Sequence, residues 1–476
     1  MARSSSSGKR SSRSQPAAKL PFRLEDVAAA GFVLLAVLLG GASAGGFAGN
    51  AVLQFVSALA IAWGIATMDW LPERKGERVP LLFAMALIVL MLVQLIPLPP
   101  ALWTQIPGRE RVVEGLVAIG VDPLPWMPIS LYPSRTLAGV TAMLPPIAAL
   151  VLVLRLGRDS AQAALWALFT AAVASVILGL GQLSGGLGSP LYFYAITNFG
   201  AAVGFFSNSN HLATLMLMVL PLVAGVAVRA RIRSDETGGA TIAWVAAPAV
   251  ALLALLGVLA AGSLAGILLA PVALAGGFLV FRSTLSWRAQ LWLMGVGLLV
   301  VAAALSVVLL SPQTLDFGAT SFGSAGMTRS HMWGISSVAV QAMLPLGSGF
   351  GSFDAVFRQF ENPATVGSIY ANHAHSDLIE LIIEGGVASG LLLLVFLLWY
   401  VRRLWKLWLS YGTRDPVACA ASIAVGLVLL HSLVDYPLRT SAIAVPFALC
   451  LGLMARSPRQ TASIAAEAPS ARHLSV

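Results

Sequence analysis

The segment His373-Ala374-His375-Ser376-Asp377 places two imidazoles and a carboxylate close together, where a long polar stretch gives way to an apolar run. An imidazole titrates near neutral pH, so one of them could take a proton from an attacking hydroxyl while a neighbouring carboxylate orients the ring. Ionisable side chains are costly at a membrane and mark functional sites there. The segment is therefore the first candidate for catalysis.

Two other interpretations of the histidines stay open. Imidazole and carboxylate are ligands that suit zinc or manganese, so His373, His375 and Asp377 could hold a metal ion with a further ligand from another loop. Alternatively, both histidines could be solvated at the interface or cap the following helix, with no role in chemistry.

Three acids continue this segment at helical spacing. Asp377, Glu380 and Glu384 stand at i, i+3 and i+7 and share one helical face. They cannot face lipid, so they need an arginine or a water-filled cavity. Arg329 and Arg358 are the nearest candidate partners in sequence, and arginine also forks onto phosphate. The group fits a phosphorylated lipid substrate; in the alternative, the arginines pair with the acids and only hold the loop in place.

Two smaller polar groups could line the same cavity. SNSNH, which ends at His211, begins an apolar run, and His431 lies one helical turn before Asp435. The serine and asparagine of the first group could equally cap a helix. The stretch PLGSGFGS lacks both the GxGxxG spacing and a following Lys-Ser/Thr, so it predicts a tight turn and not a nucleotide loop.

The composition is that of a membrane protein. The chain is 58% hydrophobic and 10% charged, with a mean hydropathy of +0.85, whereas globular proteins have about 25% charged residues. We expect an all-α membrane protein of about twelve transmembrane helices of ~20 residues each, with a large periplasmic loop between helices 9 and 10. The apolar runs lie near residues 27–47, 50–69, 80–98, 135–155, 161–182, 209–229, 241–260, 263–281, 289–310, 378–401, 416–434 and 437–455.

Positive charge predicts the orientation. With both termini cytoplasmic, every inner loop is basic, and six of the 29 Lys and Arg residues lie outside, namely Arg109, Arg111, Arg135, Arg329, Arg358 and Arg439. Residues 1–24 are then a disordered basic cytoplasmic tail, residues 25–456 the polytopic membrane domain, and residues 457–476 a second disordered cytoplasmic tail. Loops of residues 99–134 and 311–377 are periplasmic and long enough for function, so we expect a periplasmic active site.

A family resemblance rests on several stretches of this sequence, in this order: QLIPLPPALW, LYPSRTLAG, GFFSNSNHLATLMLM, MTRSHMW, PLGSGFGSF, NHAHSDLIELIIEGG and HSLVDYPLR. Over roughly residues 80–450 the chain resembles the O-antigen ligase and O-antigen polymerase superfamily, bacterial enzymes that take a glycan from undecaprenyl pyrophosphate. The family pattern is His, then Asn, Ser or Gln, nine residues, Gly, two residues, and Gly, Thr or Tyr. His375-Ser376 and Gly386 fit it, and the last position is Ser389.

The resemblance implies that His375 is the catalytic histidine, acting on the acceptor hydroxyl without a metal or other cofactor, and that arginines bind the pyrophosphate. Arg329 matches the family's loop arginine before an aromatic residue. A second family arginine is replaced by Leu264, and Arg135 or Arg358 could substitute for it. The remaining candidates for substrate binding are His211, His373, Asp377 and Glu380.

The resemblance thus implies a metal-independent, inverting glycosyltransferase in the bacterial inner membrane that transfers a glycan from undecaprenyl pyrophosphate to an acceptor hydroxyl, in O-antigen or exopolysaccharide assembly. The reasoning from the residues agrees with it on an imidazole that activates a hydroxyl beside a phosphorylated lipid. Its partners would be this donor, a glycan or lipid A core acceptor and membrane lipids, with no nucleic acid. Ligase and polymerase both stay open. The alternative is a polysaccharide or lipid-linked sugar transporter or flippase, which predicts charges deep within several spans; here they cluster at one surface.

Overall fold

The computed structural model describes most of the chain between the two tails. The described residues are 24–43, 45–67, 75–155, 158–237, 241–282, 329–363, 371–410 and 415–456, with a few positions between 286 and 306. Almost all of both predicted tails, most of the predicted ninth span (289–310) and residues 311–328 of the larger loop lie outside this part of the chain.

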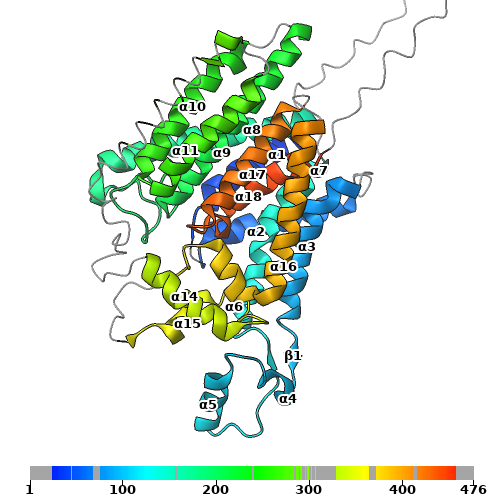
Figure 1. Ribbon diagram of the computed structural model, residues 1–476, viewed down its shortest axis with the longest axis vertical. Helices are drawn as coiled ribbons and strands as arrows, with labels where there is room; N and C mark the ends of the chain where they lie inside the picture. Colours follow the sequence, from blue (N-terminus) through cyan, green and yellow to red (C-terminus); the bar gives the residue numbers. More distant parts are fainter. Residues whose placement is uncertain are drawn as a thin grey trace, which may run out of the picture.

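The described chain is helical, as predicted (Figure 1). Its longer helices are α1 (Leu24–Leu39), α2 (Ala48–Ala66), α3 (Val79–Val93), α5 (Glu110–Ala118), α6 (Pro133–Ala142), α7 (Leu144–Arg155), α8 (Arg158–Ser184), α9 (Ser209–Thr237), α10 (Thr241–Ala261), α11 (Leu264–Phe281), α14 (Arg329–Met343), α15 (Phe353–Phe360), α16 (Asp377–Trp405), α17 (Pro416–His431) and α18 (Ser441–Ala455). Two short strands, β1 (Pro97–Leu98) and β2 (Met127–Pro128), pair antiparallel and enclose α5 and the single-turn helix α4 (Pro100–Trp103).

Several helices are suited to a bilayer, so this is a multi-pass membrane protein. Among the described residues, seven helical segments are long and apolar enough to cross: Ala48–Ala66, Gly76–Val93, Pro133–Arg155, Ala161–Ser184, Ser209–Ile232, Leu264–Phe281 and Asp377–Leu409. Three shorter apolar helices add to them: Ala246–Ala261, Pro416–His431 and Ser441–Ala455. The count of twelve and the position of the loop between helices 9 and 10 stay predictions.

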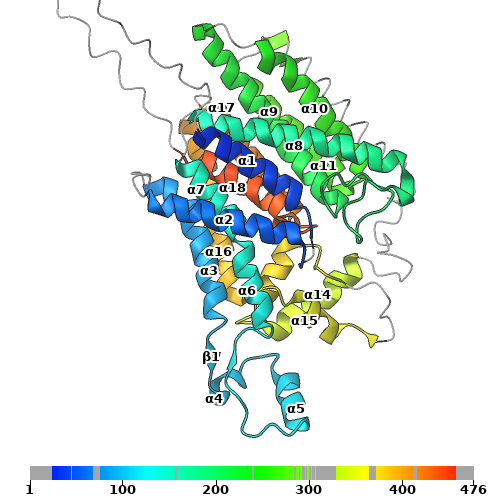
Figure 2. The same cartoon turned by 180° about the vertical axis from the view of Figure 1, so that it is seen from behind.

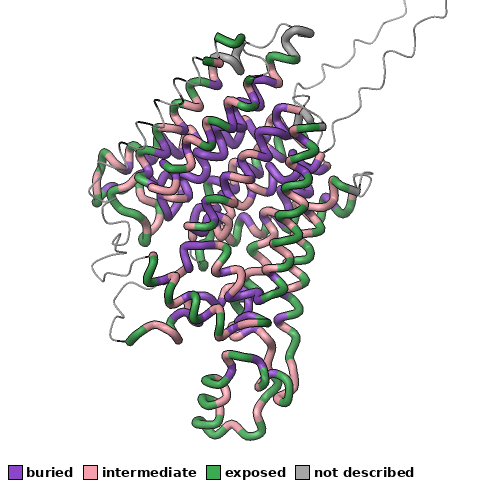
Figure 3. The backbone as a smooth tube through the Cα atoms, viewed as in Figure 1, coloured by how far each residue is buried: buried purple, intermediate pink, exposed green. Residues whose placement is uncertain are grey.

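Helix α9 is the centre of the bundle. It packs against α10, α11 and α17, while α18 packs against α17 and α7 (Figures 1 and 2). Small residues bring these helices close: a Cβ atom on Gly225 of α9 would lie 2.8 Å from the Pro416 carbonyl oxygen of α17. Buried residues gather in the middle of the bundle, whereas the lobe of α4 and α5 is largely exposed (Figure 3).

A second, smaller core ties α14 and α15 to the start of α16. Met332 and Met343 of α14 and Phe353 and Phe357 of α15 pack with Ile383 of α16. This core contains no residue of the main bundle core. It gives the polar segment before α16 a rigid support at one end of the bundle.

Helix α16 is broken at Gly386, whose φ of 63° and ψ of −153° are non-helical. A Cβ atom there would lie 2.2 Å from the Pro345 carbonyl oxygen, so only glycine fits. The PLGSGFGS loop fills the break: the Ser348 and Gly349 N–H groups donate to the carbonyls of Ile383 and Glu384. Ser389 Oγ donates to the Gly386 carbonyl at 2.8 Å. The glycines of the PLGSGFGS loop therefore allow this loop to pack closely against α16. Ser389, which stands at the last position of the family pattern, binds a carbonyl at the break.

Candidate active site

The connection between α17 and α18, residues 432–440, contains Tyr436, whose ring contacts three histidines. The ring of Tyr436 stacks on His373 with centroids 4.2 Å apart, and it meets His375 and His211 edge to face at 4.8 and 5.1 Å. These histidines come from the segment before α16 and from the start of α9. Residues distant in sequence thus share one buried site.

His375 has an unusual backbone at this site. It is buried, with 4% of its surface exposed, and its φ of 48° lies in the left-handed region that residues with a Cβ atom seldom adopt. Such a conformation costs on the order of 1–3 kcal/mol and persists only where the surroundings enforce it, often at functional sites. Here the surroundings are Tyr436 and Asp435, whose Oδ1 lies 3.5 Å from His375 Nδ1.

Backbone hydrogen bonds fix the segment that follows His375. Ser376 caps α16, since its side chain accepts from the Ile379 N–H. The Asp377 N–H donates to the carbonyls of Ser432 and Asp435 at 2.9 and 3.1 Å. The two segments that carry His375 and Asp435 are therefore held together directly.

Asp435 is the anion shared by the histidines. Burial raises its pKa, but the hydrogen bond to His375 and the nearby charges of His211, His375 and His431 have the larger combined effect, so its pKa lies below its ordinary value. Its Oδ1 accepts from the Tyr436 N–H at 2.8 Å, and its buried Oδ2 has no hydrogen-bond partner among the described residues. We call His211, His375, His431 and Asp435 the histidine cluster.

Threonines hold the two other histidines of this cluster. His211 Nδ1 lies 2.8 Å from Thr440 Oγ1, and His431 Nδ1 lies 2.9 Å from Thr214 Oγ1. Because the Thr214 hydroxyl donates to the Asn210 carbonyl, His431 Nδ1 must itself carry a proton and donate to Thr214. The buried Nε2 atoms of both histidines have no hydrogen-bond partner within the described part of the chain.

The three acids on α16 meet a single arginine. Arg439 Nη1 lies 2.9 Å from Glu384 Oε2 and 3.5 Å from Glu380 Oε1, and Arg439 Nε lies 3.7 Å from Asp377 Oδ1. The predicted common face is thus confirmed, but the expectation that Arg329 or Arg358 partners the acids is wrong. We call Asp377, Glu380, Glu384 and Arg439 the carboxylate cluster.

The carboxylate cluster is densely hydrogen-bonded. Ser432 Oγ and the Leu438 N–H donate to Asp377 Oδ2, and the Phe353 N–H donates to Glu384 Oε1. Burial lowers the pKa of Arg439, but the charges of Glu380, Glu384 and Asp377 raise it more, so the guanidinium stays charged. This arrangement compensates buried charges.

His373 links the two clusters. Its Nδ1 lies 2.9 Å from Glu380 Oε1, and its Nε2 lies 3.0 Å from the carbonyl oxygen of Ser43. Burial lowers its pKa, but the charge and hydrogen bond of Glu380 outweigh burial, so the pKa lies above its ordinary value. Between the two histidines, the Ala374 N–H donates to Glu380 and the Ala374 carbonyl accepts from Trp333 Nε1 at 3.0 Å.

The other predicted arginines lie at the edge of this site. Arg329, the first residue of α14, is half-buried and close enough to His431 for their charges to interact. Arg135 and Arg358 both pair with Asp354 of α15, and their side chains are 48% and 54% exposed. Asp354 follows Phe353, whose N–H binds Glu384, so this pair adjoins the carboxylate cluster. Their role as phosphate ligands stays a prediction.

The residues weighed as metal ligands do not converge. His373 binds Glu380, His375 faces Asp435, and Asp377 binds Ser432. Among the described residues, no group of three or more His, Cys, Asp or Glu side chains could hold a metal ion. Leu264, at the position of the family's second arginine, begins α11 and is half-buried.

Sequence reasoning left Arg439, Tyr436 and Ser43 out of the site. Arg439 and Tyr436 belong to HSLVDYPLR, which carries an aromatic residue and an arginine beside His431 and Asp435, so that motif contained the signal. Ser43 lies in a stretch of glycine, alanine and serine with no such signal. Its backbone N–H donates to Ser207 Oγ at 3.0 Å.

Comparison with known proteins gives two matches. Residues 249–393 match the family model described as O-Antigen ligase. A stretch of 140 residues is 25% identical to the "General O-oligosaccharyltransferase" of Acinetobacter baylyi, and it covers 29% of this chain and 24% of that relative. The chain thus spans about a quarter of the length of the curated relative it matches. The predicted family resemblance is confirmed for residues 249–393, which include Arg329, His375 and Gly386 and are similar to the O-antigen ligase family.

Proposed function

We propose that this protein transfers a glycan from undecaprenyl pyrophosphate to an acceptor hydroxyl at the periplasmic face of the bacterial inner membrane, in O-antigen or exopolysaccharide assembly. The observation that carries the proposal is His375: a buried histidine with left-handed backbone whose Nδ1 faces the Asp435 carboxylate at 3.5 Å. In this arrangement a carboxylate orients an imidazole, as general base catalysis requires.

The chemical step follows from this pair. With Nδ1 directed to Asp435, His375 Nε2 is the nitrogen that takes the proton of the acceptor hydroxyl. The acceptor oxygen forms a bond to the anomeric carbon as the bond from that carbon to the pyrophosphate oxygen breaks, and undecaprenyl pyrophosphate leaves with the bonding electrons. Attack from the face opposite the leaving group inverts the anomeric centre. Asp435 stabilises the imidazolium that forms, and the step needs no metal.

Arginines at the rim suit the leaving group. Negative charge grows on the pyrophosphate in the transition state, so a fixed cation there lowers the barrier. Arg329 is the first candidate, because it begins α14 and lies near His431. Arg135 and Arg358 share a single carboxylate, Asp354, so this group has one net positive charge. We assign Arg329 to the pyrophosphate and the pair to the neighbouring phosphate or glycan.

The family match supports glycan transfer from a lipid-linked donor, and the name of the oligosaccharyltransferase relative supports transfer of an oligosaccharide to an acceptor oxygen. Ligase and polymerase differ in the acceptor. A ligase uses lipid A core or, in related oligosaccharyltransferases, a protein, whereas a polymerase uses a second lipid-linked repeat.

A deletion strain carrying wild-type protein, His375→Ala or the matched control His473→Ala tests the proposal at equal expression. His473 lies outside the described residues and has no assigned role. Lipopolysaccharide, secreted polysaccharide and the undecaprenyl-linked pool are compared. We expect His375→Ala to lose product by about 100-fold or more, while His473→Ala matches wild type.

The undecaprenyl-linked pool identifies the acceptor class. Long lipid-linked chains accumulating in the His375→Ala strain indicate a ligase, and single repeat units indicate a polymerase. Wild-type product in all three fractions from the His375→Ala strain would contradict the proposed catalytic role.

A further inference from the structure

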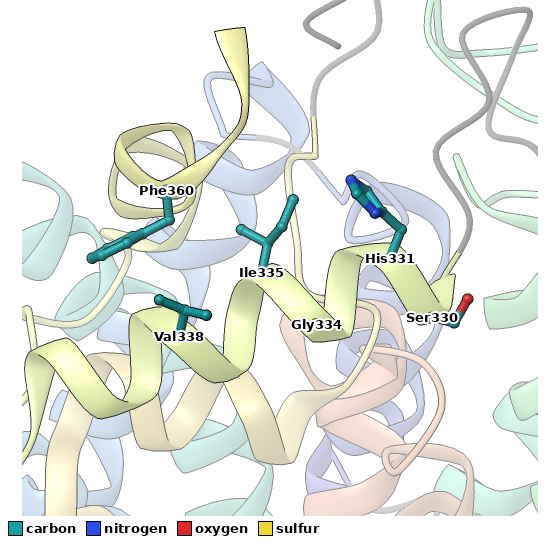
Figure 4. Close-up of a pocket in the computed structure, with 6 residues that line it drawn as sticks. All are labelled: Ser330, His331, Gly334, Ile335, Val338 and Phe360. Carbon is teal, nitrogen blue, oxygen red and sulfur yellow. The ribbon is translucent and has the colours of Figure 1, made fainter. Parts of the chain in front are cut away.

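A groove runs along one face of α14 and begins at Ser330, next to Arg329. It is open to solvent, has a volume of about 610 Å³ and is lined by Ser330, His331, Gly334, Ile335, Val338 and Phe360. Figure 4 shows His331 and Ile335 projecting from the same side of α14, with the Phe360 ring of α15 opposite Val338. The stretch from Ser330 to Val338 gives the groove a length of about 12 Å at ~1.5 Å per helical residue.

A second cavity adjoins this groove at Phe360, which lines both. It encloses about 310 Å³ between the segment before α5 and the ends of α14 and α15. Its polar lining comes from Glu110, Arg111, Gln341 and Gln359. Arg111 Nη1 donates to the Gln359 carbonyl at 2.5 Å, so this end of the groove has a fixed charged side chain.

The groove reaches the candidate active site through α14 itself. Ser330 and His331 directly follow Arg329, whose charge reaches His431. On the opposite side of the helix, Trp333 Nε1 donates to the carbonyl of Ala374, the neighbour of His375. One helix therefore forms both the wall of the catalytic site and the floor of the groove.

The lining fits a saccharide better than a lipid chain. A sugar ring presents C–H faces that pack on an aromatic ring and hydroxyl edges that need hydrogen-bonding groups, and the cavities offer Phe360 together with His331, Arg111, Gln341 and Gln359. A polyprenyl chain has no hydrogen-bonding groups, so it would displace water from these polar side chains without replacing the water's hydrogen bonds. Helix α14 is also absent from the segments suited to cross a membrane.

We propose that this groove binds the glycan of the acceptor and leads its terminal hydroxyl past Arg329 to His375. This inference rests on the proposed function and adds to it a binding site for the acceptor glycan. Its ligand is an oligosaccharide, whether the core of a lipopolysaccharide or a lipid-linked repeat unit.

Gly334 offers a way to fill the groove without disturbing the fold. It lies within α14, and a Cβ atom there would meet no atom within 4 Å. Replacing it with leucine removes a poor helix former, so the helix itself gains stability. Gly115 of α5 is a matched control, because it is also helical, exposed and without neighbours within 4 Å, and it lines neither cavity.

The experiment measures oligosaccharide binding to purified full-length protein in detergent, without donor, by saturation-transfer NMR titration. One arm uses core oligosaccharide released by mild acid from lipopolysaccharide of the deletion strain; the other uses repeat-unit oligosaccharide released from its undecaprenyl-linked pool. The proteins are wild type, Gly334→Leu, Phe360→Leu and Gly115→Leu.

We expect one of the two oligosaccharides to bind wild type and Gly115→Leu equally, and Gly334→Leu and Phe360→Leu about tenfold more weakly or worse. The arm that binds identifies the source of the acceptor. Equal binding by Gly334→Leu and wild type, or binding of neither oligosaccharide to wild type, would contradict the proposal that the groove binds the acceptor glycan. Since donor is absent, this result is separate from the transfer assay on His375→Ala, which tests the function itself.

Discussion

The histidine cluster and the carboxylate cluster lie side by side, yet they differ in how completely their polar atoms are satisfied. In the carboxylate cluster, Arg439 contacts all three acids, and backbone or hydroxyl donors reach Asp377 and Glu384. In the histidine cluster, the buried Nε2 atoms of His211 and His431 and Oδ2 of Asp435 have no hydrogen-bond partner among the described residues.

This difference indicates a structural role for the carboxylate cluster and a catalytic role for the histidine cluster. Buried polar groups in a folded protein are normally hydrogen-bonded, and exceptions point to strain, catalysis or bound solvent. The carboxylate cluster is closed and therefore suited to hold the segment before α16 in place. The histidine cluster retains acceptors for a proton or a hydroxyl. We expect substitutions in the first cluster to affect stability and substitutions in the second to affect turnover.

The largest effect is expected for Arg439→Gln. Removing the cation leaves Asp377 and the buried Glu384 without a positively charged partner, at a cost of about 3–5 kcal/mol in the free energy of unfolding. Thermal unfolding in detergent and the yield of folded protein measure it. The double variant Arg439→Gln with Glu384→Gln should recover part of the loss, since one uncompensated charge is gone. An unchanged unfolding temperature for Arg439→Gln would show that the carboxylate cluster is not a support.

Next comes Asp435→Asn, which keeps the shape of the side chain but removes the charge facing His375. We expect transfer to fall about 100-fold, while the unfolding temperature stays close to that of wild type. Asp415→Asn is the matched control: Asp415 caps the opposite end of α17, and asparagine caps a helix as well as aspartate does, so we expect both stability and turnover to stay close to those of wild type. Full activity of Asp435→Asn would remove the carboxylate from the mechanism.

The sequence alone predicted those features of the two clusters that depend on the local spacing of residues. Apolar runs predicted most of the described helices, and the i, i+3, i+7 spacing correctly put Asp377, Glu380 and Glu384 on one face. Their true partner could not be predicted, because Arg439 is 55 residues from Glu384 and nearer arginines were equally plausible by charge. The break at Gly386 depends on the approach of Pro345, which local pattern does not show.

The smallest effect concerns His373, where the two clusters meet. Its folded pKa lies above the ordinary value, because Glu380 outweighs burial and the charge of Arg439. The stabilisation by protonated His373 is therefore fully present below its unfolded pKa of about 6.5, and it is lost as pH rises through the folded value. Against His373→Gln, we expect an advantage of wild type of about 1.5 kcal/mol near pH 6, measured by thermal unfolding.

That advantage should shrink steadily toward alkaline pH. His373→Asn is the control, because it also replaces the imidazole ring with an uncharged amide but has a shorter side chain. A difference between wild type and His373→Gln that is constant or grows with pH would mean that His373 is held neutral, and that it belongs with the histidine cluster after all.

The site also joins early and late parts of the chain. The Gly40 carbonyl accepts from the Ala442 N–H at 3.0 Å, and the Ser43 carbonyl lies 3.0 Å from His373 Nε2, while Asp435, Tyr436 and Arg439 all belong to the turn before the last helix, α18. During synthesis, His375 thus emerges from the ribosome before the residues that orient it. If His375 acts as proposed, a nascent chain that stops short of α17 and α18 lacks the carboxylate that orients it, so we expect glycan transfer only after both helices have been synthesised.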